Sequence, residues 1–379
     1  MSHVMVVGCG NIGSHLIPHL ARLPGIHKVT LVDGQSYERK NLASQDIDAA
    51  DIGKPKSRVQ AARLHRIRPD LRVEAVVDLV ENLPHGFLWC DLVLSGLDTK
   101  LARMRLGQPV WRLGKVPWID AGIEPEGQLA RINAYLPGED CPCYECAWSD
   151  QEYLALETVC PCDAGGECSK PTNAPSGLGA LAAGLQIIAA QNCLEGHWDR
   201  VPFGRQVLID GMHHICYQTS YRRNPHCRFD HEIWEIEKLE CRPEEMTLQD
   251  ALGRGCSGQP NEESWLRIDG KPFVKRLTCT KCGHAKHGLR LRESLGRRAK
   301  QCPICGGAML ASGWDLTEKL TAHLPRRILS QSLAGLGLRN GEVFTIGSPE
   351  CERHFEITVT RGDPEIGAKN KFCGEKHLR

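Results

Sequence analysis

A glycine-rich turn close to the start of the printed sequence places the strongest constraint on the fold. The apolar run Val4–Val7 has the composition of a buried strand, and Gly8-Cys9-Gly10-Asn11-Ile12-Gly13 follows it directly. The stretch Ser14–Leu23 then carries leucine at helical spacing, which predicts an amphipathic helix with Pro18 near its first turn. In such a strand–turn–helix, glycines let the backbone approach a phosphate group, and the helix N-terminus favours negative charge. The segment therefore predicts a phosphate-binding α/β unit.

Strand-like and helical segments continue to alternate after this turn. The predicted helix is Lys56–Ile67, and the predicted strands are Lys28–Asp33, Arg72–Val80, Asp91–Asp98 and Val116–Ile123. This alternation indicates an α/β fold with a Rossmann-like, mixed and mainly parallel sheet and helices on both faces. Further strands are expected at Gly127–Leu136 and Arg205–Tyr221, on either side of an apolar helix at about Leu178–Ala190. That helix is too short to span a bilayer, so we expect no membrane contact.

Two domains are expected. Residues 1–231 form the first, with a polar, cysteine-rich crossover loop at about 141–175, and loops of such length are usually functional. Residues 232–379 form a C-terminal domain that contains a second cysteine cluster and short strand-like runs such as Glu342–Ile346 and His354–Val359. Its expected fold is a zinc ribbon at 279–305 with a β-rich tail.

The composition narrows the function classes. The chain has 379 residues, a net charge of +1 and 41% hydrophobic residues. These values fit a globular protein with a core and favour neither a nucleic acid nor a membrane as partner. The 19 cysteines fall mostly in C-x-C and C-x-x-C clusters, which are more typical of metal sites than of a disulfide framework. The opening MSHVMVVGCG lacks the basic stretch and cleavage site of a secretory signal, so we expect a cytoplasmic protein.

Residues after the glycine turn bear on which nucleotide binds. Asp33 ends the second predicted strand, where an acid can bind a ribose hydroxyl, so the turn alone also suits an NAD-dependent dehydrogenase. Asn41, Lys54 and Lys56 have no role in such an enzyme, but an amide and lysines suit the β- and γ-phosphates of a triphosphate. Asp98 ends the fourth predicted strand, at the edge where parallel sheets bind ligands, and its carboxylate suits Mg²⁺. A helix N-cap is the alternative role for Asp98.

With these motifs, residues 1 to about 231 resemble the ThiF/MoeB adenylation family, which includes the ubiquitin-activating enzymes. The shared marks are the glycine turn, Asp33, Asn41-Leu42 with Gln45, Ile52–Lys56, and Asp98 with Arg103 nearby. The resemblance implies ATP and Mg²⁺ and a reaction that adenylates the C-terminal glycine of a ubiquitin-like, β-grasp protein. The roles that it implies are nucleotide binding by Gly8, Gly10, Gly13 and Asp33, phosphate binding by Asn41 and Lys56, and magnesium coordination by Asp98, as a catalytic residue.

Two features depart from the family pattern. Family members usually carry a phosphate-contacting arginine where this chain has Ser44, and we hypothesise that Lys40 or Arg39 supplies the charge. Members also usually have an N-terminal helix whose arginine reaches into the site of a homodimeric partner, whereas the printed sequence begins close to its first strand. A homodimer is therefore left open.

Two cysteine groups are expected to bind Zn²⁺. Cys143 and Cys146 form a C-x-x-C pair, and Cys227 with His231 forms a C-x₃-H pair, so together they supply four tetrahedral ligands. Free buried cysteines are the alternative for this group. Two further C-x-x-C pairs, about twenty residues apart, predict a structural zinc ribbon with the ligands Cys279, Cys282, Cys302 and Cys305.

The stretch between the two cysteine pairs of the ribbon is basic. Its cations are Lys286, Arg290, Arg292, Arg297, Arg298 and Lys300. They indicate either a solvated hairpin or a docking face for an acidic partner or a nucleic acid. Aromatic residues do not interleave with these charges, which makes a nucleic acid the weaker choice.

Cysteines of the crossover loop are candidates for a covalent intermediate. The family resemblance places a thioester-forming cysteine a short distance before the apolar helix, and Cys168 lies nearest to that position. The neighbouring Lys170 would favour its thiolate. Cys160 and Cys162 are alternative nucleophiles, and a further alternative gives all three cysteines a structural role.

The leading hypothesis is a ubiquitin-like protein-activating enzyme that adenylates its carrier, captures the acyl group as a thioester and passes it to a conjugating enzyme. The domain after His231 supports this hypothesis by analogy with larger activating enzymes. A sulfur-carrier protein adenylyltransferase, acting in thiamine, molybdopterin or tRNA thiolation, is the first alternative. An NAD-dependent oxidoreductase and a non-enzymatic zinc-ribbon binding module are the others.

Overall fold

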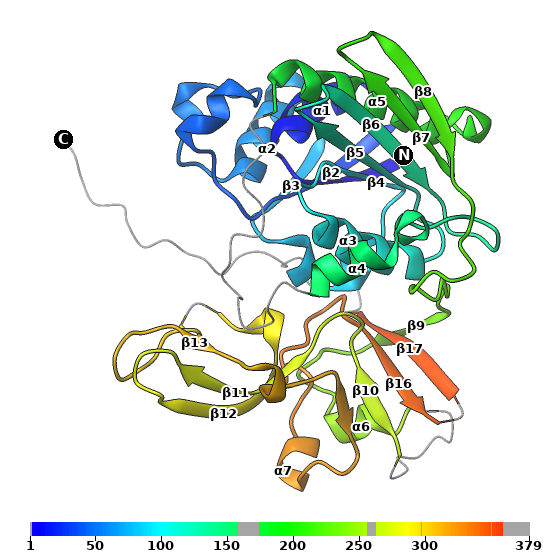
Figure 1. Ribbon diagram of the computed structural model, residues 1–379. Coiled ribbons are helices and arrows are strands. Elements are labelled where there is room, and N and C mark those ends of the chain that lie inside the picture. Colours follow the sequence, from blue (N-terminus) through cyan, green and yellow to red (C-terminus); the bar gives the residue numbers. More distant parts are fainter. Residues whose placement is uncertain (1, 158–173, 256–262, 297, 350, 359–379) are drawn as a thin grey trace.

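The computed structural model describes residues 2–157, 174–255, 263–296, 298–349 and 351–358. Within these ranges the chain forms an N-terminal unit around one large sheet and a C-terminal unit with two smaller sheets (Figure 1). The two units lie against each other.

The large sheet has eight strands in the order β3-β2-β1-β4-β5-β6-β7-β8. Neighbouring strands from β3 to β5 are parallel, and those from β5 to β8 are antiparallel. The strands are β1 Ser2–Val7, β2 Ile26–Val32, β3 Arg72–Val76, β4 Leu92–Ser95, β5 Trp118–Glu124, β6 Leu129–Tyr135, β7 Arg205–Asp210 and β8 Ile215–Ser220. The predicted Rossmann-like, mainly parallel α/β fold is confirmed.

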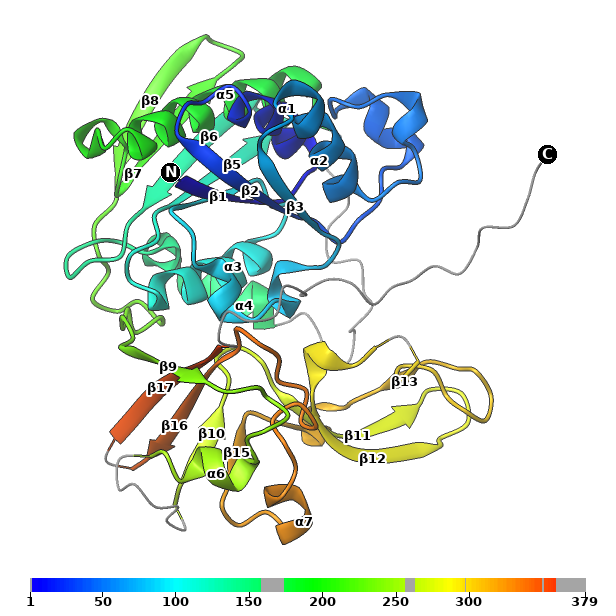
Figure 2. The ribbon, with the colours of Figure 1, turned by 180° about the vertical axis from the view of Figure 1, so that it is seen from behind.

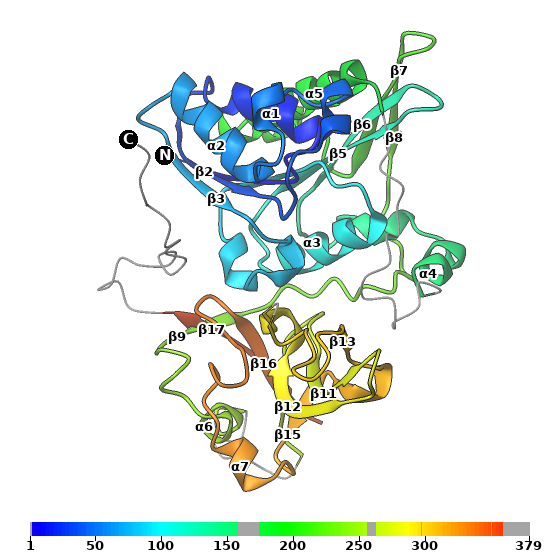
Figure 3. The same cartoon turned by 90° about the vertical axis from the view of Figure 1, so that its left-hand side faces the viewer.

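Helices cover both faces of this sheet (Figure 3). They are α1 Asn11–Leu20, α2 Lys56–Ile67, α3 Lys100–Arg112, α4 Asp150–Glu157 and α5 Ser176–Leu194. Short 3₁₀ turns are η1 Arg39–Ala43, η2 Ala49–Asp51, η3 Val80–Asn82, η4 His85–Leu88, η5 Tyr144–Ala147 and η6 Trp198–Arg200. Because side chains alternate along β1, Val4 and Val6 pack in one core with α1 and α5, and Met5 and Val7 pack in another with α3. The helix α3 lies between the sheet and the C-terminal unit.

Two local predictions are wrong. The helix α1 begins at Asn11 rather than at Ser14, so Pro18 lies near the end of the helix instead of in its first turn. The stretch Arg205–Tyr221 is a hairpin, not one strand. The Asp210 carboxylate accepts the N–H groups of Met212 and His213, at 2.9 and 3.0 Å, and this closes a turn between β7 and β8.

The helix α5 is longer than the predicted Leu178–Ala190. Among the described residues it is the one helix with the length and composition of a membrane span. It nevertheless packs against α1 and against strands β4 to β6 (Figure 2). Its buried Gln186 side chain donates to the carbonyl oxygens of Ser95 and Ile119, at 3.0 and 2.7 Å. These contacts are those of a helix that packs on the sheet.

The C-terminal unit contains a five-stranded sheet and a small ribbon. The sheet has the order β15-β10-β16-β17-β9, and in the ribbon β11 pairs with β12, β13 and β14. Its elements are β9 Ile236–Glu240, α6 Leu248–Leu252, β10 Trp265–Arg267, β11 Phe273–Cys279, β12 Ala285–Leu291, η7 Arg292–Ser294, β13 Met309–Leu310, η8 Gly313–Asp315, β14 Leu316–Thr317, β15 Lys319–Thr321, α7 Arg326–Leu329, β16 Val343–Ser348 and β17 Cys351–Thr358. Leu266, Phe344 and Phe355 are fully or almost fully buried in its core.

Buried polar contacts join the two units. The Lys271 ammonium donates to the Leu83 carbonyl oxygen at 2.6 Å and pairs with the Glu342 carboxylate at 2.7 Å. Trp89 Nε1 donates to Glu356 Oε2 at 3.0 Å. The turns η3 and η4, which lie on the α3 side of the large sheet, thus contact the C-terminal unit directly.

Candidate nucleotide and zinc sites

The glycine turn between β1 and α1 brings backbone atoms into close contact. Gly8 has a φ of +94°, and a Cβ atom there would lie 2.7 Å from the Gly96 carbonyl oxygen. A Cβ atom on Gly13 would lie 2.0 Å from the Gly8 carbonyl oxygen. A Cβ atom on Gly10 would lie 4.0 Å from the side-chain nitrogens of Gln45 and Lys56, which are its nearest neighbours. Gly8 and Gly13 therefore permit tight packing, while Gly10 leaves space in front of an amide and an ammonium group.

The Asp33 carboxylate, just after β2, supports the glycine turn. Its Oδ2 accepts the Cys9 N–H and its Oδ1 accepts the Gln35 N–H, both at 2.8 Å. Burial raises the pKa of Asp33, and the nearby Lys56 ammonium opposes this effect. The carboxylate fixes the backbone of the turn, and its binding of a ribose stays a prediction.

Lys56 is a buried lysine at the start of α2, with 6% of its surface exposed. Its Nζ donates to Gln35 Oε1 at 2.8 Å, and the described part of the chain gives it no ion-pair partner. The Gln45 Oε1 atom, next to the same space, is buried and has no hydrogen-bond partner among the described residues. A buried ammonium group that has no carboxylate within ion-pair distance among the described residues, and that faces an open glycine turn, fits a phosphate ligand.

Asn41 and Ser44 lie in and just after the turn η1. Asn41 is buried, and its Oδ1 accepts the Glu38 N–H at 2.8 Å. Its amide nitrogen makes no hydrogen bond with any described residue. Ser44 is buried and brings no charge. Lys40 forms an ion pair with Glu38 at 2.9 Å on the surface. The replacement of the family's arginine by Lys40 or Arg39 stays a prediction.

Asp98 follows β4 and precedes α3. The helix is capped by Thr99, whose side-chain oxygen accepts the Ala102 N–H at 3.0 Å. Asp98 is exposed and makes no hydrogen bond or ion pair with any described residue. Its charge contributes to the raised pKa of Asp33, so the two carboxylates lie in the same region. The helix-cap alternative for Asp98 is therefore wrong, and its carboxylate is available to a hard cation such as Mg²⁺.

Arg103 pairs with Asp120 rather than with Asp98. Its Nε donates to Asp120 Oδ1 and Oδ2, at 3.0 and 2.9 Å, and both side chains are buried. Ser95 Oγ donates to the same carboxylate at 2.7 Å. This group ties α3 to β4 and β5. Sequence reasoning missed Asp120, although a carboxylate within the apolar run Val116–Ile123 was a signal for a buried partner.

The crossover loop is described up to α4 and again shortly before α5. Cys160, Cys162 and Cys168 lie between these ends, outside the described residues. On the near side, Glu152 of α4 pairs with Lys100 of α3 at 2.5 Å. The helix α4 therefore lies beside the end of α3 that follows Asp98, and the role of Cys168 stays a prediction.

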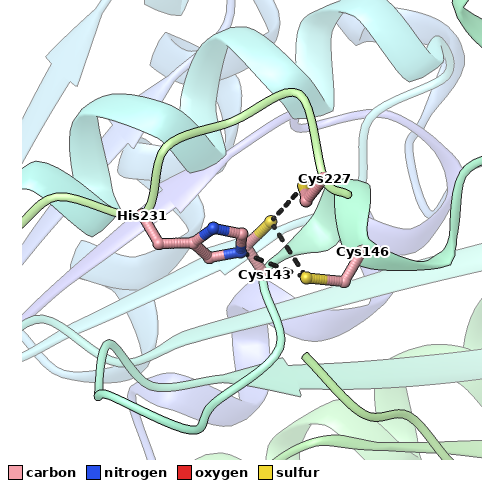
Figure 4. A group of neighbouring side chains, drawn as sticks. All are labelled: Cys143, Cys146, Cys227 and His231. Carbon is pink, nitrogen blue, oxygen red and sulfur yellow. Dashed lines mark hydrogen bonds between the residues drawn. The ribbon is translucent and has the colours of Figure 1, made fainter. Parts of the chain in front are cut away.

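Cys143, Cys146, Cys227 and His231 come together in one cluster (Figure 4). Their ligand atoms all lie within 4.8 Å of one another. The Cys143 sulfur is 3.7 Å from the Cys146 sulfur and 3.8 Å from the Cys227 sulfur, and His231 Nε2 is 3.1 Å from the Cys146 sulfur. Thiolates bound tetrahedrally to Zn²⁺ at about 2.3 Å lie about 3.8 Å apart. The cluster therefore fits a zinc site.

The end of α3 holds this cluster in place. Trp111 Nε1 donates to the His231 carbonyl oxygen at 3.0 Å, and its ring meets the imidazole edge to face. The Arg112 guanidinium pairs with Asp230 at 2.8 Å. Cys141 packs beside the cluster without joining it. One end of α3 thus contacts the Cys143 cluster, and the other end follows Asp98.

The ribbon cysteines form the second cluster. Ligand sulfurs of Cys279, Cys282, Cys302 and Cys305 also lie within 4.8 Å of one another. The Cys279 and Cys305 sulfurs are 3.4 Å apart, and those of Cys282 and Cys302 are 3.6 Å apart. Two C-x-x-C pairs that converge in this way fit a closed structural zinc site.

Known proteins resemble the N-terminal unit. The ThiF family model matches residues 1–229. Over 153 residues the chain is 30% identical to the NEDD8-activating enzyme E1 catalytic subunit of Saccharomyces cerevisiae, covering 38% of this chain and 50% of that protein. Over 231 residues it is 29% identical to the sulfur carrier protein adenylyltransferase of Thermus thermophilus, covering 59% of this chain and 80% of that protein.

The fold is also found among solved structures. The crystal structure of E. coli MccB with ATP matches with a TM-score of 0.50 and 21% identity, covering 60% of this chain and 66% of that chain. The chain spans half or less of the length of several curated relatives, between 35% and 50%. The family model nevertheless covers more than half of this chain and includes the glycine turn, Lys56 and Asp98. The chain belongs to the ThiF family.

Proposed function

We propose that the chain is an ATP-dependent adenylyltransferase that activates the C-terminal carboxylate of a ubiquitin-like, β-grasp protein. Three residues near the carboxyl ends of the parallel strands carry the proposal. Lys56 is buried and has no carboxylate within ion-pair distance, Gly10 leaves open space before its backbone, and Asp98 has no ion-pair or hydrogen-bond partner, each among the described residues. A dinucleotide does not need a buried ammonium group beside the glycine turn, whereas a triphosphate does. Similarity to a NEDD8-activating enzyme and to a sulfur carrier protein adenylyltransferase supports this class of reaction.

The chemistry assigns a role to each side chain. A carboxylate oxygen of the terminal glycine attacks the α-phosphorus of ATP, the bond to the oxygen that bridges the β-phosphate breaks, and pyrophosphate leaves. Gly10 lets phosphate approach the backbone at the start of α1. Lys56 and the Asn41 amide nitrogen would donate to phosphate oxygens and stabilise the departing charge. Asp98 would hold Mg²⁺, which neutralises phosphate charge when it is bound.

The edge strand β8 of the large sheet offers a surface suited to a protein substrate. The strand β8 is the outer edge of the sheet, and all of its residues are exposed. Ile215 and Tyr217 of β8, with Met212 of the preceding turn, expose about half of their surfaces, 45%, 47% and 53%. Exposed apolar side chains at an open sheet edge are typical of protein-binding surfaces. We place the body of the carrier protein here, with its C-terminal tail reaching toward Asp98.

The first proposed fate of the adenylate is a thioester. A thiolate of the crossover loop, with Cys168 as our choice, would attack the acyl carbon while AMP leaves, and the acyl group would then pass to a conjugating enzyme. The second is formation of a thiocarboxylate on a sulfur carrier, in which sulfide from a sulfur donor would attack the acyl carbon while AMP leaves. Similarity to the Thermus thermophilus enzyme favours this fate. We also propose a cytoplasmic location, because both cysteine clusters would bind zinc only with reduced thiols.

Incubation with ATP, Mg²⁺ and a panel of β-grasp proteins that end in glycine tests these proposals. Pyrophosphate release that requires one of these proteins supports adenylation, and stabilisation by NAD but not by ATP with Mg²⁺ would sink it. A non-reducing gel then separates the two fates. A thiol-sensitive adduct that disappears in Cys168→Ala but persists in Cys160→Ala and Cys162→Ala supports the thioester. A carrier thiocarboxylate that forms when sulfide is added as the sulfur donor, without an adduct, supports sulfur transfer.

A further inference from the structure

A groove in the C-terminal unit has no part in the proposed adenylation. It has a volume of about 310 Å³ and lies on the ribbon, which stands to one side of the five-stranded sheet (Figure 2). One wall is the β11–β12 hairpin. The rest of the lining contains Leu295, Ala299, Gln331 and Gly335. The groove therefore lies between segments that are far apart in the sequence.

The floor of the groove is apolar. Val274 and Leu277 of β11 line it and are buried, with 4% and 7% of their surfaces exposed. Leu289 and Leu295 are half-buried beside the same space. A floor of this kind accepts an aliphatic side chain, because apolar surface on both partners then leaves water.

Three cations line the same groove, from the two ribbon strands. Arg276 is oriented by the Asp315 carboxylate, 2.9 Å from its Nε. Arg290 Nε donates to the Ser294 hydroxyl at 3.1 Å, and within the described chain this guanidinium has no carboxylate partner. Lys286 is exposed and has no ion-pair partner in the described part of the chain either. Arg290 and Lys286 are therefore available to acidic groups from outside.

The charge around the groove is strongly one-sided. Residues 273–300 contain nine lysines and arginines but one carboxylate, that of Glu293. The Glu293 carboxylate is almost fully buried, pairs with Arg292 at 3.6 Å, and lines a different cavity, between the two units. It does not neutralise the groove, and Asp315, from outside this range, is paired with Arg276, which leaves the charges of Lys286 and Arg290 unneutralised among the described residues. The surface therefore favours an acidic ligand over a neutral or basic one.

The backbone of β12 offers a place for an extended chain. The strand is at the edge of the ribbon sheet, and the residues from Ala285 to Gly288 are exposed. A Cβ atom on Gly288, which lines the groove, would meet no other atom within 4 Å. The edge of such a strand can pair with an added strand, and the open space over the face of the sheet at Gly288 can take a side chain of that strand.

We propose that this groove binds an extended, acidic segment of a partner protein, with carboxylates on Lys286 and Arg290 and an aliphatic side chain on the floor. A nucleic acid fits less well, because the lining contains no tryptophan, tyrosine or phenylalanine on which bases would stack. Trp314, with 91% of its surface exposed, lies outside the lining.

Fluorescence anisotropy with the full chain tests the proposal. The probe is a fluorescein-labelled peptide of about a dozen residues in which glutamate and leucine alternate, long enough to cover β12. A matched peptide with glutamine in place of glutamate is the neutral control, and single-stranded oligothymidine is the nucleic-acid probe. The acidic peptide should bind at least about tenfold more tightly than the neutral one, and binding should weaken as salt rises.

Three variants distinguish peptide binding in the groove from non-specific electrostatic attraction. Lys286→Glu combined with Arg290→Glu should weaken the acidic peptide by about tenfold or more, and Lys238→Glu, an exposed charge on β9, should not. Ala299→Trp keeps every charge but fills the groove, so it should weaken the peptide to the same degree. Circular dichroism and melting temperatures check that each variant is folded.

Three results would overturn the proposal. The first is the absence of peptide binding at about 100 μM, a concentration well above a typical specific dissociation constant. The second is an affinity for the acidic peptide in the folded Ala299→Trp variant that equals that of the wild type. The third is tighter binding of oligothymidine than of the acidic peptide, in which case the basic ribbon serves a nucleic acid.

Discussion

Thr99 and Asp98 have separate tasks at the junction of β4 and α3. The Thr99 side-chain oxygen caps the helix by accepting the Ala102 N–H at 3.0 Å. The adjacent Asp98 carboxylate is exposed and has no partner among the described residues. We therefore expect Thr99 to act on helix stability and Asp98 on ligand binding, so a substitution at one residue should change only one of these properties.

Thr99→Ala removes the cap and should lower the free energy of unfolding of the N-terminal unit by about 1 kcal/mol. Asp98→Ala leaves the cap intact and should change it by less than about 0.5 kcal/mol. Urea unfolding followed by circular dichroism measures both effects. An equal loss of stability in the two variants would show that Asp98 shares in the capping.

Lys56→Met keeps much of the side-chain volume but removes the ammonium group that faces the glycine turn. It should weaken ATP binding by about tenfold or more, because the buried ammonium group that would contact phosphate is lost. The rise in melting temperature with ATP and Mg²⁺ measures this effect. Lys238→Met, at an exposed position on β9 in the C-terminal unit, is the matched control and should bind ATP as the wild type does. Unchanged ATP binding by Lys56→Met would remove this lysine from the site.

The strands and the convergence of the two cysteine clusters were open to prediction because their signals are local. Apolar runs between turn residues mark β1 and β4, and C-x-x-C spacing reflects the ligand geometry of zinc. The glycines of the turn also have a local cause, since Gly13 must approach the Gly8 carbonyl oxygen.

Other features depend on contacts between distant segments. The buried Arg103–Asp120 pair links α3 to β5, so neither residue alone reveals it. The residues of α3 contain a proline at position 109 and a weak apolar pattern, and the helix was not predicted. The groove of the ribbon needs Gln331 and Gly335 beside β12, which only the folded chain brings together.

Metal analysis tests the two cysteine clusters. The wild type should contain two zinc ions per chain, one for each cluster. Cys143→Ser should contain one, and its melting temperature should fall because the cluster holds the end of α3. Cys141→Ser is the control and should keep both ions, since Cys141 is outside the cluster. Two zinc ions in Cys143→Ser, or fewer than two in the wild type, would contradict the assignment.

His354 should make stability depend on pH. Burial, assisted by the positive charges of Arg112 and Arg267, lowers the pKa of His354 from 6.5 to about 4. The neutral ring stacks on Trp234, with centroids 4.1 Å apart, and its Nδ1 is 3.0 Å from Thr345 Oγ1. Because the pKa is lower in the folded chain than in the unfolded chain, this stabilisation is complete above about pH 6.5 and is lost as the pH falls toward about 4.

Urea midpoints at about pH 7 and about pH 5 measure this dependence. The midpoint of the wild type should fall on acidification. The fall should be smaller in His354→Phe, which keeps a ring against Trp234 but cannot take up a proton. His65→Phe, at an exposed position on α2, should behave as the wild type does. If the urea midpoint of His354→Phe falls as far as that of the wild type, groups other than His354 cause the pH dependence.

Exchange of labelled pyrophosphate into ATP tests adenylation most directly, because it requires the reversible formation of an acyl-adenylate. With a β-grasp protein that supports exchange by the wild type, Asp98→Ala should lower the rate by about a hundredfold or more. Thr99→Ala should stay within about threefold of the wild type, since its effect falls on stability. Exchange by Asp98→Ala at the wild-type rate would contradict the account.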